Sequence, residues 1–255
     1  MLLETRLNRI LEIVEERESV TVNELMNEFD ASESTIRRDL TTLHKQGKLV
    51  KVHGGAVKLQ GDVHTVDDEV SMRQNLHYKE KRLIAKAAAA RIHDNDFVFI
   101  DAGTTTDQMI EFIEAKNVTV VTNGMGHAYK LATRGITTIL LGGTVKASTE
   151  AVVGEEALLS LSKYNFTKGF FGANGVMIEQ GFTTPELKEA LLKEQAIRQT
   201  KEVYILADSS KFGVTSSVRF GSFKDGIIIT NKIENPTYKK YENVWEVQDD
   251  LHGYI

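Results

Sequence analysis

The 255-residue chain contains no cysteine and only two prolines. Without thiols it can form neither disulfides nor thiolate metal sites, and it has no cysteine nucleophile. With so little proline, a Pro-rich linker is not expected. No Walker or G-x-G-x-x-G spacing occurs, and the seven histidines are scattered without metal-ligand spacing. We therefore predict no cofactor and no bound metal.

Long apolar runs are also missing. No stretch approaches the roughly 20 apolar residues that a transmembrane helix needs. Residues 1–18 are charged throughout and lack the apolar core of a signal peptide. We expect a soluble, cytoplasmic protein. The length and the hydrophobic fraction of 41% fit a small module followed by one larger globular domain.

Positive charge is gathered in one short segment of an otherwise acidic chain. The net charge is −5, and residues 1–35 hold three Arg or Lys against nine Asp or Glu. Residues 36–58 hold six Arg or Lys against one Asp, a net charge of +5. A local basic patch of this kind is the electrostatic footprint expected of a nucleic-acid-binding segment.

Three helices are predicted in the N-terminal region. Apolar residues recur at helical spacing over 3–17. A capping box that begins at Thr21 starts a short second helix. Ser32 is a suitable N-cap for a third helix over about 33–46, which Gly47 ends.

The third helix has two chemically different faces. Its inner face carries Ile36, Leu40 and Leu43 at helical spacing. The opposite stripe carries hydroxyls and cations, namely Ser34, Arg38, Thr41 and Lys45, with Arg37 and His44 beside it. Such groups hydrogen-bond to base edges and phosphates in a major groove. The pattern therefore indicates a recognition helix.

A hairpin follows the third helix. Residues 49–59 read LVKVHGGAVKL, two β-prone runs around a Gly-Gly pair. Three helices and a hairpin in this order predict a winged helix-turn-helix over residues 1–58, with double-stranded operator DNA as its partner. A small helical domain with a solvated charged face is the alternative, and the full ordered set of signals favours DNA binding. The predicted DNA contacts are Ser32, Ser34, Thr35, Arg37, Arg38, Thr41, Lys45, Lys51, His53 and Lys58.

The rest of the chain alternates between short apolar strands and helices. We interpret residues 59–74 as a polar linker and 75–255 as an effector-binding and oligomerisation domain. Strands are predicted at 97–100, 118–121, 138–141, 169–171, 203–206 and 227–229, and helices at 105–115, 124–134, 154–162 and 185–200. This alternation predicts an α/β domain with a mostly parallel sheet that is covered on both faces.

Polar and glycine-rich loops follow five of these strands. They read Asp101–Thr106, Thr122–Gly124, Gly142–Thr144, Gly172–Gly175 and Asp208–Lys211. In open α/β sheets, ligands bind at the carboxyl ends of the strands. The threonine run opens a helix whose amides can hold an anion, and a lysine can supply a point charge to a phosphate. Turn residues are common at strand ends, but five converging loops favour a small anionic ligand.

Both halves of the chain resemble the DeoR-type family of bacterial regulators. The N-terminal resemblance rests on Ala31–Leu40 and His53–Ala56, and it gives Ser34, Thr35, Arg37 and Arg38 the recognition role. The C-terminal resemblance rests on Lys79–Ala85, Asp101–Thr106, Val121–Gly124, Leu141–Gly143, Gly181–Pro185, Glu189-Ala190 and Ala207–Gly213. It implies a domain similar to ribose-5-phosphate isomerase that binds a sugar phosphate without turning it over.

Within the family, three stretches look most like repressors of fructose operons. They are Asn75–His77, the threonine run and Gly181–Pro185. This resemblance implies fructose 1-phosphate as the effector. The predicted ligand contacts are Arg73, Lys81, Asp101, Gly103, Thr104, Thr105, Thr106, Thr122, Asn123, Gly124, Gly142, Gly143, Asn174, Glu189, Asp208 and Lys211. Four of them have an alternative role. Asp101 could cap its own turn, and Glu189 could be an exposed helix residue. Lys81 and Arg73 could relay the presence of the ligand to the linker.

The main alternative to a regulator is an active sugar-phosphate isomerase with a helical N-terminal module. An isomerase needs a positioned carboxylate to move a proton between carbons. Where such enzymes carry an acid in a Gly-Ala-Asp run, this chain has Asn174. An amide cannot act as the base, so we predict a non-enzyme. A protein-interaction module that does not bind DNA gains little support from the basic helix. We expect a homo-oligomer, a dimer or a tetramer.

Overall fold

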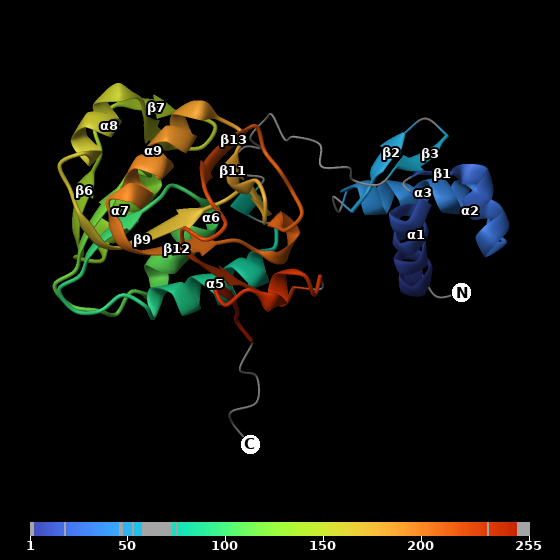
Figure 1. Ribbon diagram of the computed structural model, residues 1–255, viewed down its shortest axis with the longest axis horizontal. Helices are drawn as coiled ribbons and strands as arrows, with labels where there is room; N and C mark the ends of the chain where they lie inside the picture. Colours follow the sequence, from blue (N-terminus) through green and yellow to red (C-terminus); the bar gives the residue numbers. More distant parts are fainter. Residues whose placement is uncertain are drawn as a thin grey trace, which may run out of the picture. The chain divides into compact units, whose positions relative to one another are not determined.

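The computed structural model describes residues 3–17, 19–45, 48–52, 54–57, 73–74, 76–233 and 235–248 (Figure 1). The chain divides into two compact units, Met1–Asp62 and Val63–Ile255. Each unit has a hydrophobic core of its own. None of the helices in the described ranges is long and apolar enough to cross a lipid bilayer.

The N-terminal unit is a winged helix-turn-helix. Its elements are α1 (Leu3–Arg17), β1 (Ser19–Thr21), α2 (Val22–Phe29), α3 (Glu33–Lys45), β2 (Val50–Val52) and β3 (Gly55–Val57). The strands form an antiparallel sheet in the order β1-β3-β2. The three helices and the hairpin confirm the predicted architecture. Strand β1 was not predicted, because its three residues become a strand only by pairing with the distant β3.

The predicted caps and core of this unit are present. Thr21 and Glu24 make both hydrogen bonds of the capping box at the start of α2. The Thr35 amide donates to the Ser32 hydroxyl at 3.3 Å, as an N-cap requires. The three apolar residues of the inner face of α3, Ile36, Leu40 and Leu43, are fully buried. Gly47, predicted to end this helix, lies outside the described residues.

One glycine of the wing is required by close backbone contact. A Cβ on Gly55 would lie 2.1 Å from the carbonyl oxygen of Val20, where β3 pairs with β1. No side chain fits at that distance, so a glycine is needed for the wing to close against the strand that follows α1.

The C-terminal unit is built on one parallel sheet of seven strands. The strands are β4 (Phe97–Ile100), β5 (Thr119–Thr122), β6 (Thr137–Leu140), β9 (Phe166–Gly172), β12 (Thr200–Leu206), β14 (Ile227–Thr230) and β15 (Val244–Glu246). Their order across the sheet is β15-β14-β12-β9-β4-β5-β6, and every pairing is parallel. All six predicted strands are present, and β15 adds a seventh at one edge.

Helices cover both faces of this sheet, as predicted. They are α5 (Tyr78–Ala89), α6 (Thr104–Met109) with η1 (Ile110–Phe112), α7 (Met125–Thr133), α8 (Glu155–Leu161) and α9 (Leu187–Arg198). Buried residues of α5, α6 and α7 share one core cluster, and those of α8 and α9 share the other. Figure 1 shows α5 on one side of the sheet and α8 and α9 on the opposite side.

Small antiparallel elements complete the unit. They are the hairpin β7 (Thr144–Lys146) and β8 (Ala151–Val153), and the sheet β10 (Gly175–Met177), β11 (Gly181–Thr184) and β13 (Val218–Gly221) in the order β10-β11-β13. Two 3₁₀ turns are η2 (Ser209–Lys211) and η3 (Tyr238–Lys240). None of these short strands was predicted, since they form by antiparallel pairing with one another.

The strand order has one reversal, between β4 and β9. From β4 the chain adds β5 and β6 in one direction, and from β9 it adds β12, β14 and β15 in the other. Adjacent strands whose connections leave in opposite directions open a crevice at their carboxyl ends, where ligands of doubly wound folds bind. A ligand site is therefore expected at the loops that follow β4 and β9.

Candidate functional site

The predicted DNA-binding face lies on α3 and the wing. Ser34, Arg37 and Arg38 are exposed, opposite the buried apolar face of the helix. Arg37 is held by Glu33 one turn earlier, at 2.7 Å. Within the described ranges Arg38 makes no ion pair, so its guanidinium is available to an external acceptor. Exposed donors on one helix face are what reading of base edges requires.

Hydrogen bonds organise the other predicted contacts. The Ser32 hydroxyl lies 3.0 Å from that of Ser34 and 2.9 Å from that of Thr35, at the start of the helix. The Lys51 ammonium donates to the Thr41 hydroxyl at 2.7 Å and so links wing to helix. Lys45 is the last residue of α3, and His53 and Lys58 lie outside the described residues.

A buried ion pair fixes α3 against α1. Arg6 donates from Nε to Oδ2 of Asp39 at 2.6 Å, and the Asp39 side chain is almost completely buried. Asp39 follows Arg38 directly in the sequence, so a residue next to the predicted DNA-binding face anchors the helix. The pair orients α3 and leaves its outer stripe facing solvent.

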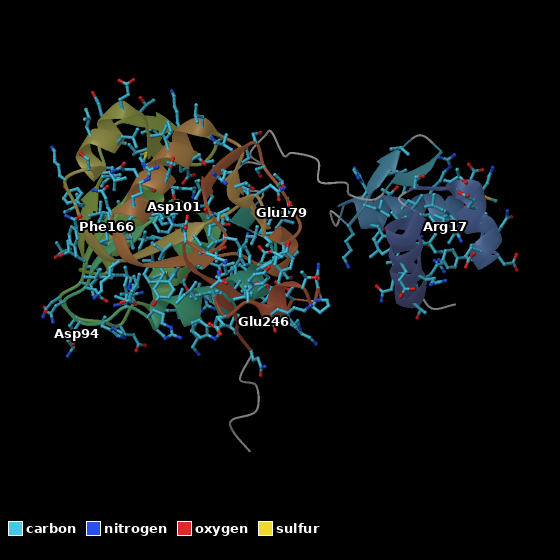
Figure 2. The ribbon with its side chains drawn as sticks, viewed as in Figure 1. Arg17, Asp94, Asp101, Phe166, Glu179 and Glu246 are labelled. Atoms are coloured by element: carbon cyan, nitrogen blue, oxygen red, sulfur yellow. The ribbon has the colours of Figure 1, made fainter. Side chains whose placement is uncertain are left out.

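A second buried ion pair lies at the reversal of the strand order in the C-terminal unit. Asp101 directly follows β4, and its carboxylate accepts hydrogen bonds from the Lys193 ammonium and from the Gly172 amide at 3.1 Å. Lys193 also donates to the Gly172 carbonyl at 3.0 Å. Burial raises the pKa of the Asp101 carboxyl, and the adjacent Lys193 opposes that rise. The pair ties α9 to the ends of β4 and β9. Figure 2 labels Asp101 within the C-terminal unit.

The threonine loop after β4 is held by side chains from the neighbouring loop. The Thr106 hydroxyl donates to the Asp101 carbonyl at 2.6 Å and lies 3.1 Å from His127 Nε2. Asn123 accepts from the Ala102 amide at 2.8 Å. Burial lowers the pKa of His127 to about 4, so the ring is neutral and Nε2 can accept from the Gly103 amide.

Most other predicted residues of this edge are also engaged within the protein. Thr122 is fully buried, and its hydroxyl accepts from the Gly124 amide at 3.0 Å. Thr105 is buried, whereas Gly103 and Thr104 are partly exposed at the start of α6. Asn174 accepts from the Thr184 hydroxyl at 3.2 Å. The buried or hydrogen-bonded side chains Thr105, Thr122 and Asn174 thus shape the loops, whereas Gly103 and Thr104 are accessible to a ligand.

The glycine loop after β6 is the most open part of this edge. Gly142 and Gly143 are exposed, and Gly143 has a φ of +142°. A Cβ there would also lie 2.8 Å from the Val153 carbonyl oxygen. A glycine is therefore required where the chain enters the β7–β8 hairpin.

Glu189 is buried rather than exposed. Its carboxylate accepts from Thr149 at 2.7 Å and from the Lys146 ammonium at 3.1 Å, and Lys146 also pairs with Glu186. These contacts fasten the β7–β8 hairpin to α9. The alternative prediction, that Glu189 is an exposed helix residue, is wrong, because α9 turns this side chain toward the hairpin.

A cluster rich in cations lies beside the carboxyl end of β12. Lys81 on α5 is buried, and its ammonium donates to the Arg73 carbonyl at 2.5 Å. The charges that act on it include Asp208, Lys211 and Arg73. Burial lowers the pKa of Lys81 to about 8. Burial also acts to raise the pKa of Asp208, but Lys211, Ser210 and His77 outweigh it and leave that pKa below the usual range.

The cation cluster beside β12 and the polar loops that follow β4, β5 and β6 together have the chemistry to bind a phosphorylated polyol. The cluster has three cations, Lys81, Lys211 and Arg73, against two carboxylates, Asp208 and Glu80, so its net positive charge suits a phosphate. The glycine and threonine loops offer backbone groups to hydroxyls. The carboxylates near the reversal, Asp101 and Glu189, are both engaged by lysines. Among the residues that the structure describes, no group of three or more His, Asp or Glu is placed to hold a metal ion.

Three residues of this edge were missed in the sequence, namely His127, Lys146 and Lys193. A signal for Lys193 was available: it shares the inner face of α9 with Ala190 and Ala196, so a charge interrupts a buried stripe. No local signal marks His127 or Lys146, since each becomes part of the edge only through contacts with distant loops.

Two family models match the chain. The model described as DeoR-like helix-turn-helix domain matches residues 6–60, and the one described as DeoR C terminal sensor domain matches residues 76–232. The second match covers more than half of the chain. Both models describe a regulator rather than an isomerase, in agreement with the prediction of a non-enzyme.

Curated relatives match over almost the full length. An uncharacterized HTH-type transcriptional regulator, FruR, of Bacillus subtilis is 45% identical over 95% of this chain and 96% of its own. The regulator IolR of the same organism is 33% identical over 95% and 96%. A lactose phosphotransferase system repressor of Staphylococcus epidermidis is 33% identical over 95% and 97%.

Solved structures match less closely. Ribose 5 phosphate isomerase A from Neisseria gonorrhoeae has a TM-score of 0.40 and 18% identity, over 52% of this chain and 53% of its own. A translation initiation factor eIF-2B from Pyrococcus horikoshii has a TM-score of 0.41 and 15% identity, over 85% and 69%. The family models and the relatives establish that this chain belongs to the DeoR family of transcriptional regulators.

Proposed function

We propose that the chain represses a sugar-utilisation operon and that a phosphorylated sugar, bound at the carboxyl edge of the parallel sheet, controls its affinity for operator DNA. Fructose 1-phosphate is the proposed effector. The observation that carries the proposal is the gathering of Asp208, Lys211 and Arg73 around the buried Lys81, at the carboxyl end of β12, next to the strands β9 and β4 between which the sheet order reverses.

The spacing of the strands suits such a ligand. Asp208 follows β12 and Asp101 follows β4, with β9 between them. Neighbouring strands lie about 4.8 Å apart, so the two strand ends are separated by roughly 10 Å. A phosphate held by the cations at β12 would leave the sugar hydroxyls to reach the threonine and glycine loops that follow β4, β5 and β6.

The names of relatives are consistent with a sugar-linked regulator. FruR and the lactose phosphotransferase system repressor match almost all of this chain. The fructose assignment depends on the resemblance of Asn75–His77, Thr104–Thr106 and Gly181–Pro185 to repressors of fructose operons. An isomerase gains no support, because Asn174 stands where an acid would act.

DNA binding is proposed to involve two copies of the chain. Two recognition helices of an oligomer must meet half-sites about 34–36 Å apart, or a multiple of that distance. The effector would change operator affinity by the ratio of its affinities for the two states of the oligomer, typically 1–3 kcal/mol.

Thermal unfolding over a panel of ligands tests the effector. The panel contains fructose 1-phosphate, fructose 6-phosphate, ribose 5-phosphate, free fructose and inorganic phosphate. A ligand at 100 times its Kd stabilises the folded protein by about 2.7 kcal/mol. We expect fructose 1-phosphate to raise the melting temperature most and free fructose to leave it unchanged. Equal melting curves across the panel would overturn the proposal of a sugar-phosphate effector.

A selection from random duplex DNA tests the repressor. The expected result is one enriched, inverted-repeat sequence whose binding by the full chain changes when the best ligand of the panel is added. Enrichment of no sequence, or binding that ignores every ligand, would contradict the proposed function.

A further inference from the structure

Lys81 is a buried ammonium at an unusual place. Only 4% of the residue is exposed, yet it stands one turn into α5, beside the loop after β12. Among the described residues its one hydrogen-bond acceptor is the Arg73 carbonyl. An ammonium has three N–H donors, and burying it with incomplete pairing costs free energy. A residue with only a packing role would more often be apolar here.

The charges around Lys81 come from three parts of the chain. Asp208 and Lys211 face it from the loop after β12, Glu80 from α5 itself, and Arg73 from the segment before α5. Two of these four groups are cations, so the surroundings of the ammonium hold as much positive as negative charge. An added anion would be attracted by all three cations together.

The acceptor of the Lys81 hydrogen bond belongs to the first residue of the C-terminal unit that the structure describes. Arg73 and Gln74 are the first residues that the structure describes after Val57, the last residue of the wing strand β3. In the sequence, residues 58–72 lie between Arg73 and Val57, the end of the last strand of the DNA-binding unit. The hydrogen bond from Lys81 therefore joins the proposed phosphate site to the C-terminal end of the connecting segment.

The helix that carries Lys81 is firmly anchored. Ile84, Ala85 and Ala88 of α5 are fully buried in the core cluster on that face of the sheet. The helix packs against α6, β12 and β14. A ligand at this site can thus redirect the lysine side chain far more easily than it can displace the helix.

We propose that Lys81 couples effector binding to the connecting segment: a phosphate bound beside Lys211 draws the Lys81 ammonium from the Arg73 carbonyl and releases that end of the segment. A phosphate oxygen is a charge-assisted acceptor and forms a stronger hydrogen bond with an ammonium than a neutral carbonyl does. The inference rests on the proposed function and deepens it by naming the residue that passes the signal on.

The test compares Lys81→Met with Lys86→Met in the full chain. Methionine keeps most of the apolar stem at the buried position, and Lys86 is an exposed lysine on the same helix. Three quantities are measured for each protein: the Kd of fructose 1-phosphate, the operator affinity with and without it, and hydrogen exchange of a peptide that spans Arg73 and Gln74.

In the wild-type protein and in Lys86→Met, we expect the ligand to change operator affinity by about 5–150-fold and to speed exchange in the Arg73 peptide. In Lys81→Met, exchange should be fast without ligand and unaltered by it. The operator affinities with and without ligand should then agree within about twofold. Fructose 1-phosphate should still bind through Lys211 and the loops, with a Kd raised by about tenfold or less.

If the ligand changes the operator affinity of Lys81→Met as much as that of the wild-type protein, the coupling role is overturned and the effector proposal stays intact. Absence of sugar-phosphate binding in the wild-type protein would instead overturn the effector proposal, and the coupling role with it. If Lys81→Met fails to fold, exchange in the wild-type protein decides: a peptide spanning Arg73 whose exchange ignores a bound, active ligand refutes the inference.

Discussion

The Lys193 ammonium on α9 binds the Asp101 carboxylate at the end of β4, and both side chains are buried. The same ammonium donates to the Gly172 carbonyl at the end of β9. One side chain thus ties together the two strands between which the order of the sheet reverses. It lies over Phe220, 5.3 Å from the ring centroid, so its environment is largely apolar apart from these acceptors.

Removing one member of this pair should be costly. Lys193→Met leaves the Asp101 carboxylate buried without its cation, which typically costs about 3–5 kcal/mol. The double variant Lys193→Met with Asp101→Asn restores a neutral site and should recover much of that loss. Urea unfolding of the full chain, monitored through the transition of the C-terminal unit, measures the loss in the single variant and the recovery in the double variant. Equal destabilisation of the single and double variants would show that the ion pair itself is not what matters.

Arg38 should carry operator recognition. Its guanidinium is exposed and makes no ion pair within the described ranges, so Arg38→Ala should lose about 1–3 kcal/mol of specific binding and relax the preference at one base pair. Titration of the selected operator and of single-base variants measures both effects. Fructose 1-phosphate binding should be unaltered, and Arg198→Ala on α9 is the matched control. Unchanged operator affinity in Arg38→Ala would refute the recognition role.

Lys211 should be needed for the phosphate. Lys211→Ala removes one of the three cations of the cluster that Lys81, Lys211 and Arg73 form, so the affinity for fructose 1-phosphate should fall while operator binding without ligand stays at the wild-type level. Lys201→Ala is the control, since Lys201 is exposed near the amino end of the same strand, β12. Calorimetric titration measures the loss. A retained response to the ligand would exclude Lys211 from the site.

Lys81 should make stability depend on pH in alkaline solution. Burial lowers the pKa of Lys81 from 10.5 to about 8, so between these values the unfolded chain binds a proton that the folded chain has lost. The free energy of unfolding should therefore rise with pH through this group, and below pH 8 its contribution should be constant. The measurement is the difference in unfolding free energy between wild type and Lys81→Met from pH 7 to 10, in phosphate-free buffer. A difference that does not rise would contradict this prediction.

Much of the architecture could be predicted because it is local or periodic. The capping box at Thr21, the two-faced third helix and the apolar strands each follow from residues close together in the sequence. The same reasoning failed for β1, β7 and β8, whose few residues become strands only through partners elsewhere. Local sequence patterns also did not predict the hydrogen-bond partners of the loop residues. Asn123 accepts from the Ala102 amide, a contact across 21 positions that no spacing rule predicts.

By itself, the sequence determined the fold class, the two-faced third helix and the order of the long strands and helices, because hydrophobic periodicity and capping act over a few residues. Only the tertiary structure decided which side chains meet. It placed the reversal of the sheet between β4 and β9, buried Lys193 against Asp101, and directed Lys81 to the Arg73 carbonyl. Those contacts depend on how a twisted parallel sheet brings distant strand ends to one edge, and no local pattern encodes that.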